Sequence, residues 1–194
     1  RIIAMWESMR NDVIDVYPKR RPSTAKLETI IHRIDDMHVH DSYHSLSIEG
    51  YHVTKDLISK IQHGKWNPGD NELDNQHKNA MAAKGYFETF QQVKNSISRI
   101  FDGKDAAIVI QSDLQKWYQA LFSPAVEAGI ISEINLAGYR NNQVYIRNSM
   151  HTPPAKDVLL DCLEAFFECL KGEKDPIVRA VLGHFIFVYI HPYM

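Results

Sequence analysis

The chain has 194 residues, of which 44% are hydrophobic and 24% charged, an ordinary composition for a globular domain that buries a sizeable core. Its net charge of -2 excludes the strongly basic surface that marks proteins binding nucleic acid or an anionic membrane. Two cysteines are too few for a disulfide framework, and no apolar run reaches the roughly 20 residues of a membrane span, so we expect a cytoplasmic protein.

The first half of the chain reads as a series of helices. Apolar residues at helical spacing predict a helix over residues 2–16, followed by a linker, YPKRRPST. Ser23 or Thr24 is a suitable cap for a second helix, with apolar positions up to residue 34 on one face. The stretch HVHDSYHSLSIEG, residues 38–50, reads as a helix that ends at Gly50. Thr54 begins a short helix to about residue 63, and a loop follows.

The second half is also mainly helical. We expect a long helix over residues 72–101, although Gly85 weakens it by about 1 kcal/mol relative to alanine. Another helix covers about residues 106–122. The segment YRNNQVYI, residues 139–146, predicts a short β-hairpin, because Asn141 and Asn142 tolerate the positive φ of a tight turn.

The last two predicted helices cover residues 155–170 and 177–190. Asp175 as N-cap and Pro176 at the first position begin the final helix. This helix is apolar nearly all round, so we expect it to be buried centrally, with His184 as a hydrogen-bonded core histidine. Pro192 disfavours helical geometry at the residue before it, which places His191 where a core helix gives way to a loop.

The end of the chain, FVYIHPYM, resembles the opening of the Fic-domain signature, H-P-F-x-[D/E]-G-N-G-R. His191 and Pro192 match its first two positions, and Tyr193 stands where phenylalanine is usual. A histidine seven residues upstream, His184, also fits the family pattern. The remaining signature positions would follow Met194.

Two further motifs carry the same resemblance. SLSIEG, Ser45 to Gly50, fits the inhibitory-helix pattern [S/T]-x-x-x-E-[G/N], and AGYRNNQVYI, residues 137–146, is similar to the segment leading into the family's flap. The resemblance implies an all-α, Fic-type domain with a small β-hairpin flap. It would cover residues 36–194, with the inhibitory helix at about residues 40–50, and residues 1–35 would form an N-terminal helical extension.

The resemblance implies a protein adenylyltransferase, a nucleotidyltransferase that moves AMP from ATP to a Ser, Thr or Tyr hydroxyl of a target protein. His191 would be the catalytic base, a role that suits histidine because its ordinary pKa of about 6.5 leaves it neutral at cellular pH. ATP and Mg²⁺ are the implied co-substrate and cofactor. The phosphate-binding loop and the metal ligand would follow Met194, so we expect the printed chain itself to be inactive.

The same resemblance gives roles to two other sets of residues. Glu49 would pair with the second arginine of the signature and occupy the place of the ATP γ-phosphate, with Ser45 as a supporting partner and Gly50 completing the inhibitory motif. Val144, Tyr145 and Ile146 would form the edge of the flap on which the target docks. The protein would then be autoinhibited.

Several alternatives stay open. Without a catalytic role, His191 is a structural histidine at a helix end. Without an inhibitory role, Glu49 is a solvated residue, and without a docking role the hairpin is an ordinary surface feature. A protein with the same fold could instead catalyse a different reaction. The alternatives are hydrolytic removal of AMP from a modified target protein and transfer of another phosphate-containing group. A non-catalytic helical interaction module is a third reading, and a homo-oligomer is compatible with all of them. His40 and His44 have the i, i+4 spacing of zinc ligands, but no third ligand is placed to join them, so we expect no metal site there.

Overall fold

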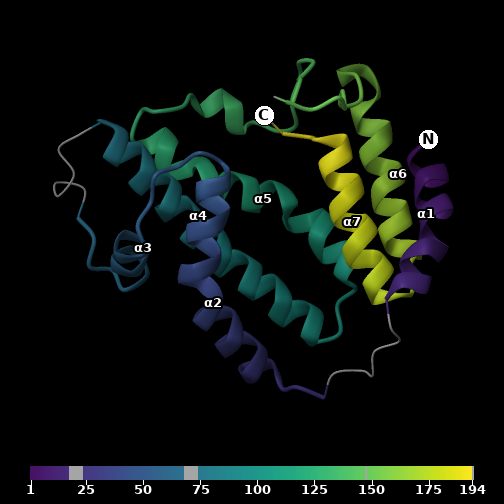
Figure 1. Cartoon of the computed structure of the whole chain (residues 1–194), viewed down its shortest axis with the longest axis horizontal. Coiled ribbons are helices and arrows are strands. Elements are labelled where there is room, and N and C mark those ends of the chain that lie inside the picture. The colour runs from purple at the N-terminus through teal and green to yellow at the C-terminus, as the bar shows by residue number, and fades with distance from the viewer. Residues whose placement is uncertain (18–23, 68–73, 147, 194) are drawn as a thin grey trace. The chain divides into compact units, whose positions relative to one another are not determined.

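The computed structural model describes residues 1–17, 24–67, 74–146 and 148–193, with the backbone alone for residues 74–76. All regular structure within these ranges is helical, which confirms the predicted all-α class (Figure 1). None of the described helices is both long and apolar enough to cross a membrane. The α-helices are α1 (Ile2–Val16), α2 (Leu27–Ile48), α3 (Lys55–Gln62), α4 (Asp74–Phe101), α5 (Ala106–Glu127), α6 (Leu159–Gly172) and α7 (Pro176–Ile190), and the 3₁₀ turns are η2 (Glu133–Leu136) and η3 (Lys156–Val158).

The chain forms two compact units, which are described separately. The first comprises residues 1–23, 105–111 and 138–194, and therefore contains α1, α6 and α7. The second comprises residues 24–104 and 112–137, with α2, α3, α4 and most of α5. The boundary that we predicted between residues 35 and 36 falls inside α2, and α1 belongs to the unit of α7. That boundary therefore does not coincide with a division between the units.

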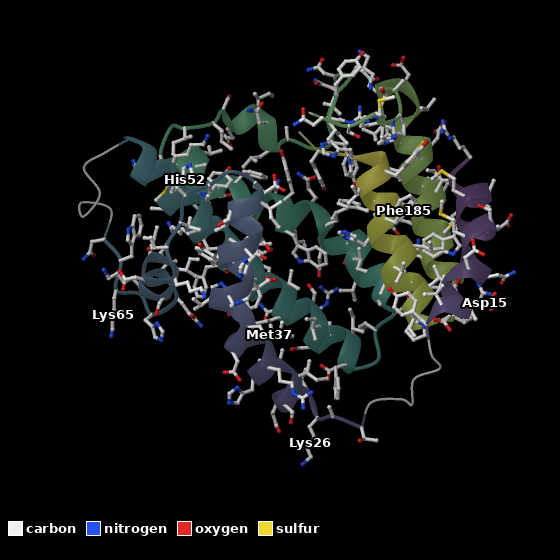
Figure 2. The ribbon with its side chains drawn as sticks, in the orientation of Figure 1. Asp15, Lys26, Met37, His52, Lys65 and Phe185 are labelled. Atoms are coloured by element: carbon white, nitrogen blue, oxygen red, sulfur yellow. The ribbon has the colours of Figure 1, made fainter. Side chains whose placement is uncertain are left out.

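In the first unit α1, α6 and α7 pack side by side (Figure 1). Their core is formed by Ile2, Trp6, Leu163, Phe166, Phe167, Leu170, Val178, Leu182, Ile186 and Ile190. We expected α7 to be a central buried helix, but part of it is exposed: Phe185, labelled in Figure 2, is 44% exposed and Val188 is 48% exposed. His184 is also exposed, so it is not the core histidine that we expected.

Helix α7 begins as predicted. The Asp175 carboxylate accepts hydrogen bonds from the backbone N–H groups of Ile177 and Val178, at 2.8 and 3.1 Å, and Pro176 occupies the first turn. These are the donors that a helix start leaves without intrahelical partners, and proline lacks the N–H that would need one. The start of this helix is therefore fixed by local sequence.

In the second unit α2, α3 and α4 enclose a cluster of Leu46, Val53, Ile58, Ile61 and Ala83. The two segments that we expected as separate helices, up to residue 34 and from residue 38, form the single helix α2, whose N-cap is Lys26. Thr24 does not cap it, and Ser23 and most of the predicted linker lie outside the described residues. Thr54 caps α3 as predicted, since its hydroxyl accepts from the N–H of Leu57 at 3.1 Å.

Helices α4 and α5 approach one another at a glycine. A Cβ atom at Gly85 would lie 1.9 Å from the backbone oxygen of Leu121, so no side chain fits there. The glycine that weakens α4 as an isolated helix is therefore required by its packing against α5. Helix α5 runs five residues beyond the predicted end at Phe122 and includes Pro124, which is fully buried.

The predicted β-hairpin over residues 139–146 does not form paired strands, since no strand is found among the described residues. Its polar groups bond elsewhere. The N–H of Arg140 donates to the carbonyl of Pro192 at 2.9 Å, and the side chain of Gln143 donates to the carbonyl of Pro153 at 3.0 Å. Because these bonds tie the segment to the end of α7 and to residues 151–154, the two arms do not pair with each other.

Candidate functional site

His191 occupies the position predicted for it, directly after the last residue of α7. Its N–H donates to the carbonyl of Phe187 at 3.0 Å, so it caps the helix, and its backbone is left-handed, with φ 48° and ψ 64°. Few residues other than glycine adopt this conformation, because Cβ then crowds the neighbouring carbonyl. The next residue, Pro192, is buried, and His191 itself is partly exposed. A fixed backbone thus carries a side chain that solvent reaches.

Four consecutive carbonyl groups at this end of α7 accept hydrogen bonds from the segment that we had predicted as a hairpin and its continuation. The His151 ring donates from Nε2 to the carbonyl of Tyr189 at 2.8 Å. The carbonyls of Ile190 and His191 accept from the Arg140 guanidinium, at 3.3 and 2.7 Å, and that of Pro192 accepts from the Arg140 N–H. Carbonyl groups at a helix end have no intrahelical donors. The side chains of His151 and Arg140 supply donors to three of these four, and the backbone N–H of Arg140 supplies the fourth.

Arg140 is a residue for which the sequence analysis predicted no role. It is 4% exposed, and besides the helix end it donates to the carbonyls of Asn142 and Pro154, at 3.0 and 2.6 Å. Burial lowers the pKa of Arg140. The available signal was a lone arginine in the polar segment YRNN, which does not distinguish a buried guanidinium from a solvated one.

The predicted docking residues Val144, Tyr145 and Ile146 lie in the same unit as His191, in an irregular segment. Tyr145 is 77% exposed, while Val144 and Ile146 are partly buried. The carbonyl of Ile146 accepts from the N–H of Ser149 at 3.1 Å. These residues therefore offer an exposed aromatic side chain, but not a ready-made strand.

The predicted inhibitory residues lie in the other unit, at the C-terminal end of α2. Ser45 is in the last turn of the helix, and Glu49 is its C-cap. Gly50 follows with a positive φ of 82°, the conformation that glycine commonly adopts directly after a helix. The N–H of Glu49 donates to the carbonyl of Ser45 at 3.3 Å, so the i, i+4 relation between the two is present. Glu49 is exposed, and no salt bridge to it is found in the described part of the chain.

Ser45 is tied to α4 through Tyr86. The Tyr86 hydroxyl donates to the Asp41 carboxylate at 2.6 Å and lies 3.3 Å from the Ser45 Oγ (both contacts join α2 to α4). Burial, and then the bond to Asp41, raises the pKa of Tyr86 to about 12. This phenol therefore stays protonated at cellular pH and holds the C-terminal half of α2 against α4.

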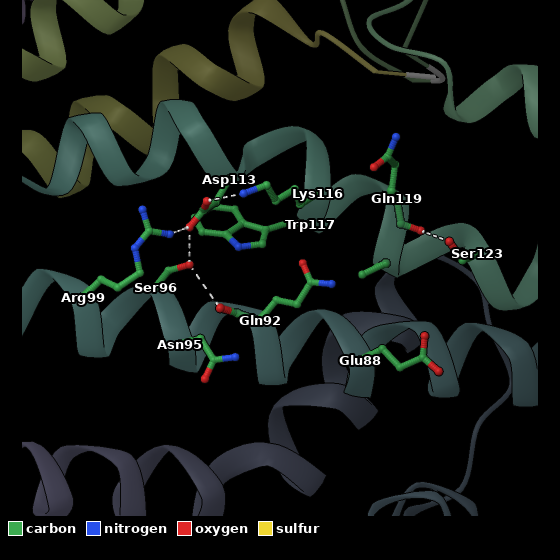
Figure 3. Close-up of a pocket in the computed structure, with 11 residues that line it drawn as sticks. Glu88, Gln92, Asn95, Ser96, Arg99, Asp113, Lys116, Trp117, Gln119 and Ser123 are labelled. Atoms are coloured by element: carbon green, nitrogen blue, oxygen red, sulfur yellow. Dashed lines mark hydrogen bonds and ion pairs between the residues drawn. The ribbon is translucent and has the colours of Figure 1, made fainter.

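A polar pocket that the sequence did not predict lies between α4 and α5, with a volume of about 520 Å³ (Figure 3). Among its lining residues, the Asp113 carboxylate accepts from Arg99 at 2.6 Å and from Ser96 at 2.7 Å. Burial alone would raise the pKa of Asp113, but the hydrogen bonds from Ser96, Arg99 and Lys116 outweigh it and lower the pKa to about 2. A carboxylate occupied in this way is unsuited to proton transfer near neutral pH.

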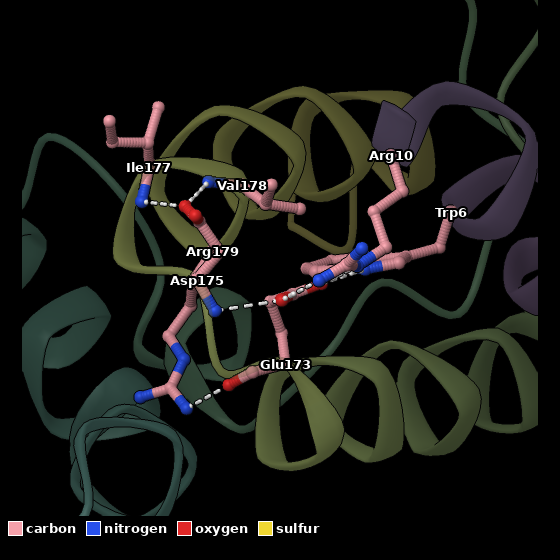
Figure 4. Close-up of polar contacts among 7 residues, drawn as sticks. All are labelled: Trp6, Arg10, Glu173, Asp175, Ile177, Val178 and Arg179. Atoms are coloured by element: carbon pink, nitrogen blue, oxygen red, sulfur yellow. Dashed lines mark hydrogen bonds and ion pairs between the residues drawn. The ribbon is translucent and has the colours of Figure 1, made fainter. Parts of the chain in front are cut away.

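A second buried carboxylate, Glu173, joins α1 to the α6–α7 connection (Figure 4). It accepts from the Arg10 guanidinium at 2.8 and 3.1 Å, from the Trp6 indole at 3.3 Å and from the Asp175 N–H at 2.8 Å. Burial again acts to raise the pKa of Glu173, but the hydrogen bonds lower it to about 2. Its partners mark it as a structural link within the first unit rather than a catalytic acid.

The histidine pair that we considered for zinc has its rings close together. The Nε2 atoms of His40 and His44 are 3.3 Å apart on the exposed side of α2. In the described residues no group of three or more His, Cys, Asp or Glu side chains is placed to hold a metal ion. None of the described residues is therefore assigned to Mg²⁺ or to another metal.

No protein-family model matches this chain. The arrangement of the residues themselves must therefore support any function. The structure places His191 with Arg140 and the docking residues in one unit, and places Ser45, Glu49 and Gly50 in the other.

Proposed function

We propose that this protein is a protein adenylyltransferase, in which His191 is the general base and Glu49 holds activity low. The observation that carries the proposal is the position of His191: it follows a packed helix directly, its backbone is fixed in an uncommon conformation, and its side chain is partly exposed. Uncommon backbone conformations of this kind concentrate at functional sites. The H-P-aromatic pattern and the two upstream motifs supply the reaction class.

In this reaction the neutral His191 imidazole takes the proton from the hydroxyl of the target side chain. The hydroxyl oxygen forms a bond to the α-phosphorus of ATP, the bond between the α- and β-phosphates breaks, and pyrophosphate leaves. Mg²⁺, where it is bound, balances charge on the phosphates. The resemblance assigns the ligands of ATP and Mg²⁺ to positions after Met194, so this chain's own contribution is the base and its placement.

A rigid support matters because proton transfer requires the base within hydrogen-bonding reach of the attacking hydroxyl. The hydrogen bonds to Tyr189, Ile190, His191 and Pro192 restrain the backbone on both sides of the imidazole. The exposed Tyr145, in the same unit, is the side chain that we propose to contact the target protein. This contact would hold the target's modifiable loop beside the base.

The inhibitory role of Glu49 is part of the same proposal. Its exposure leaves the carboxylate available to pair with an arginine of the phosphate-binding loop, which would exclude the γ-phosphate of ATP. The Tyr86 contact with Ser45 and Asp41 supports this role, since it restrains the helix that presents Glu49.

The test is transfer of label from ATP labelled at the α-phosphate, with a chain that continues through the complete signature. Label should appear on protein, increase with Glu49→Gly and disappear with His191→Ala. His184→Ala is the matched control, because it removes an exposed histidine from the same helix and should leave transfer unchanged.

Three outcomes would contradict parts of the proposal. Unchanged labelling with Glu49→Gly would remove Glu49 from the inhibitory role. Release of AMP from a modified target, lost with Glu49→Gly, would make the protein a hydrolase. Binding of ATP with no transfer by any variant would favour a non-catalytic interaction module.

A further inference from the structure

We propose that Arg140 is a positioning residue, which holds His191 in its left-handed conformation and thereby aims the imidazole. The consequence for catalysis rests on the function proposed above, whereas the structural claim stands on the contacts alone. Arg140 lies 51 positions before His191 in the sequence, so only the fold brings the two together.

Arg140 binds three consecutive carbonyl groups around His191. Its Nη2 donates to Ile190 at 3.3 Å, its Nε to His191 at 2.7 Å, and its backbone N–H to Pro192 at 2.9 Å. These three oxygens belong to the peptide groups immediately before and after His191 and to the next one along. A single residue thus fixes the orientation of the peptide planes that determine φ and ψ at His191.

The remaining guanidinium contacts anchor Arg140 itself. Nη1 donates to the carbonyl of Asn142 at 3.0 Å, and Nη2 donates to that of Pro154 at 2.6 Å. These acceptors lie on either side of the docking segment that contains Val144 and Tyr145. Arg140 therefore connects the end of α7, the start of the docking segment and the segment leading into α6.

The energetic cost of burying the Arg140 guanidinium indicates that this residue has a role beyond packing. Arg140 is 4% exposed, and no salt bridge with a carboxylate is found for it in the residues that the structure describes. A buried cation is unfavourable unless other groups replace its hydration. Here carbonyl oxygens do so, including those at the negative end of the α7 dipole. A left-handed non-glycine residue likewise persists only where its surroundings hold it.

Lysine is the informative substitution at Arg140. It keeps the positive charge and the aliphatic stem, but its single ammonium group cannot reach several carbonyls with the planar fork that a guanidinium provides. Arg179→Lys is the matched control: Arg179 is also partly buried and donates to a backbone carbonyl, that of Glu173, but it lies near the opposite end of α7.

The first measurement is the backbone NMR of His191. In the printed chain, Arg140→Lys should shift the amide and Cα resonances of His191 strongly while helix content stays the same, and Arg179→Lys should leave them in place. Unchanged His191 resonances in a folded Arg140→Lys variant would overturn the proposal. This readout is independent of any enzymatic activity.

The second measurement is AMP transfer by a chain with the complete signature. Arg140→Lys should lower kcat by about 10- to 100-fold with little change in the KM for ATP, since displacement of a catalytic group by about 1 Å has effects of this size. An unchanged kcat in an active enzyme would also overturn the proposal. Absence of transfer in the unmodified protein would contradict the proposed function instead, and the NMR result would still decide the role of Arg140.

A double-mutant cycle covers the case in which Arg140→Lys loses stability. Glycine adopts the left-handed conformation without steric cost, so His191→Gly removes the need for support. Arg140→Lys should therefore destabilise the His191→Gly chain less than it destabilises the unmodified chain, measured by denaturant unfolding. Additive effects of the two substitutions would show that Arg140 does not act through the conformation of His191.

Discussion

The guanidinium of Arg140 donates a 2.7 Å hydrogen bond to the carbonyl of His191, at the point where the backbone of His191 turns left-handed. This contact joins two residues that sequence patterns place in separate motifs, Arg140 in the predicted hairpin and His191 in the signature at the end of the chain. The conformation of His191 is thus a property of the folded unit.

The left-handed backbone at His191 predicts an unusual ranking of substitutions. Asparagine tolerates this conformation, whereas a β-branched residue is strongly disfavoured there. We expect His191→Val to lower the free energy of unfolding by about 1–2 kcal/mol relative to His191→Asn. Denaturant unfolding of the two variants measures the difference, and equal stability would argue against the left-handed geometry.

Gly85 should resist substitution because of the backbone contact between α4 and α5. A methyl group at this position would overlap the Leu121 carbonyl, and a backbone group does not move aside as a side chain does. We expect Gly85→Ala to destabilise the protein by about 1–3 kcal/mol, although alanine is the better helix former. Gly172→Ala, where nothing lies within 4 Å, is the control and should be neutral or stabilising in the same unfolding assay.

Glu173 should make stability depend on acid pH. Hydrogen bonds from Arg10, Trp6 and the Asp175 backbone hold its pKa at about 2, below the ordinary value of 4.5. The carboxylate therefore stabilises the folded state above about pH 4.5, and that contribution is lost as the pH falls toward 2. We expect Glu173→Gln to be less stable at pH 7 by about 1–3 kcal/mol and to show a shallower loss of stability between pH 4.5 and 2. Parallel pH profiles for the two proteins would contradict this.

His38 should make the packing of α2 on α4 sensitive to mild acid. It is 1% exposed, and it packs against the rings of Phe87 and Phe90. Burial lowers the pKa of His38, and the charge of Lys94 also acts to lower it. The side chain of Gln62 and the carboxylates of Asp41 and Asp35 act to raise the pKa, but they do not outweigh burial.

A histidine with a lowered pKa in the folded protein binds a proton more readily in the unfolded chain. The folded protein therefore loses stability as the pH falls below 6.5, the ordinary pKa of histidine. Hydrogen exchange of the α2 amides should therefore accelerate between pH 7 and 5, beyond the intrinsic effect of pH. His38→Leu should remove this acceleration, whereas His184→Gln, which removes an exposed histidine, should retain it. An acceleration that persists in His38→Leu would assign it to another group.

Local sequence signals placed most of the helices correctly. The bounds of α1, the Thr54 cap of α3 and the start of α7 follow from spacing and capping residues that act within a few positions. Local signals failed where distant residues decide the outcome. Helix α5 continues through the buried Pro124, and Arg140, in the predicted hairpin, bonds to the end of α7.

The candidate site shows the same division. From the sequence, Pro192 and the apolar run before it place His191 at the end of a helix, because the ring of a proline constrains the residue before it. The tertiary structure alone decided that His191 is left-handed and that Arg140 is buried against it. The tertiary structure also decided that His184 and Phe185 are exposed, although nearly every side of α7 carries apolar residues. Capping and helix spacing act between neighbours in the chain, whereas burial and the pairing of buried polar groups depend on which distant segments pack together.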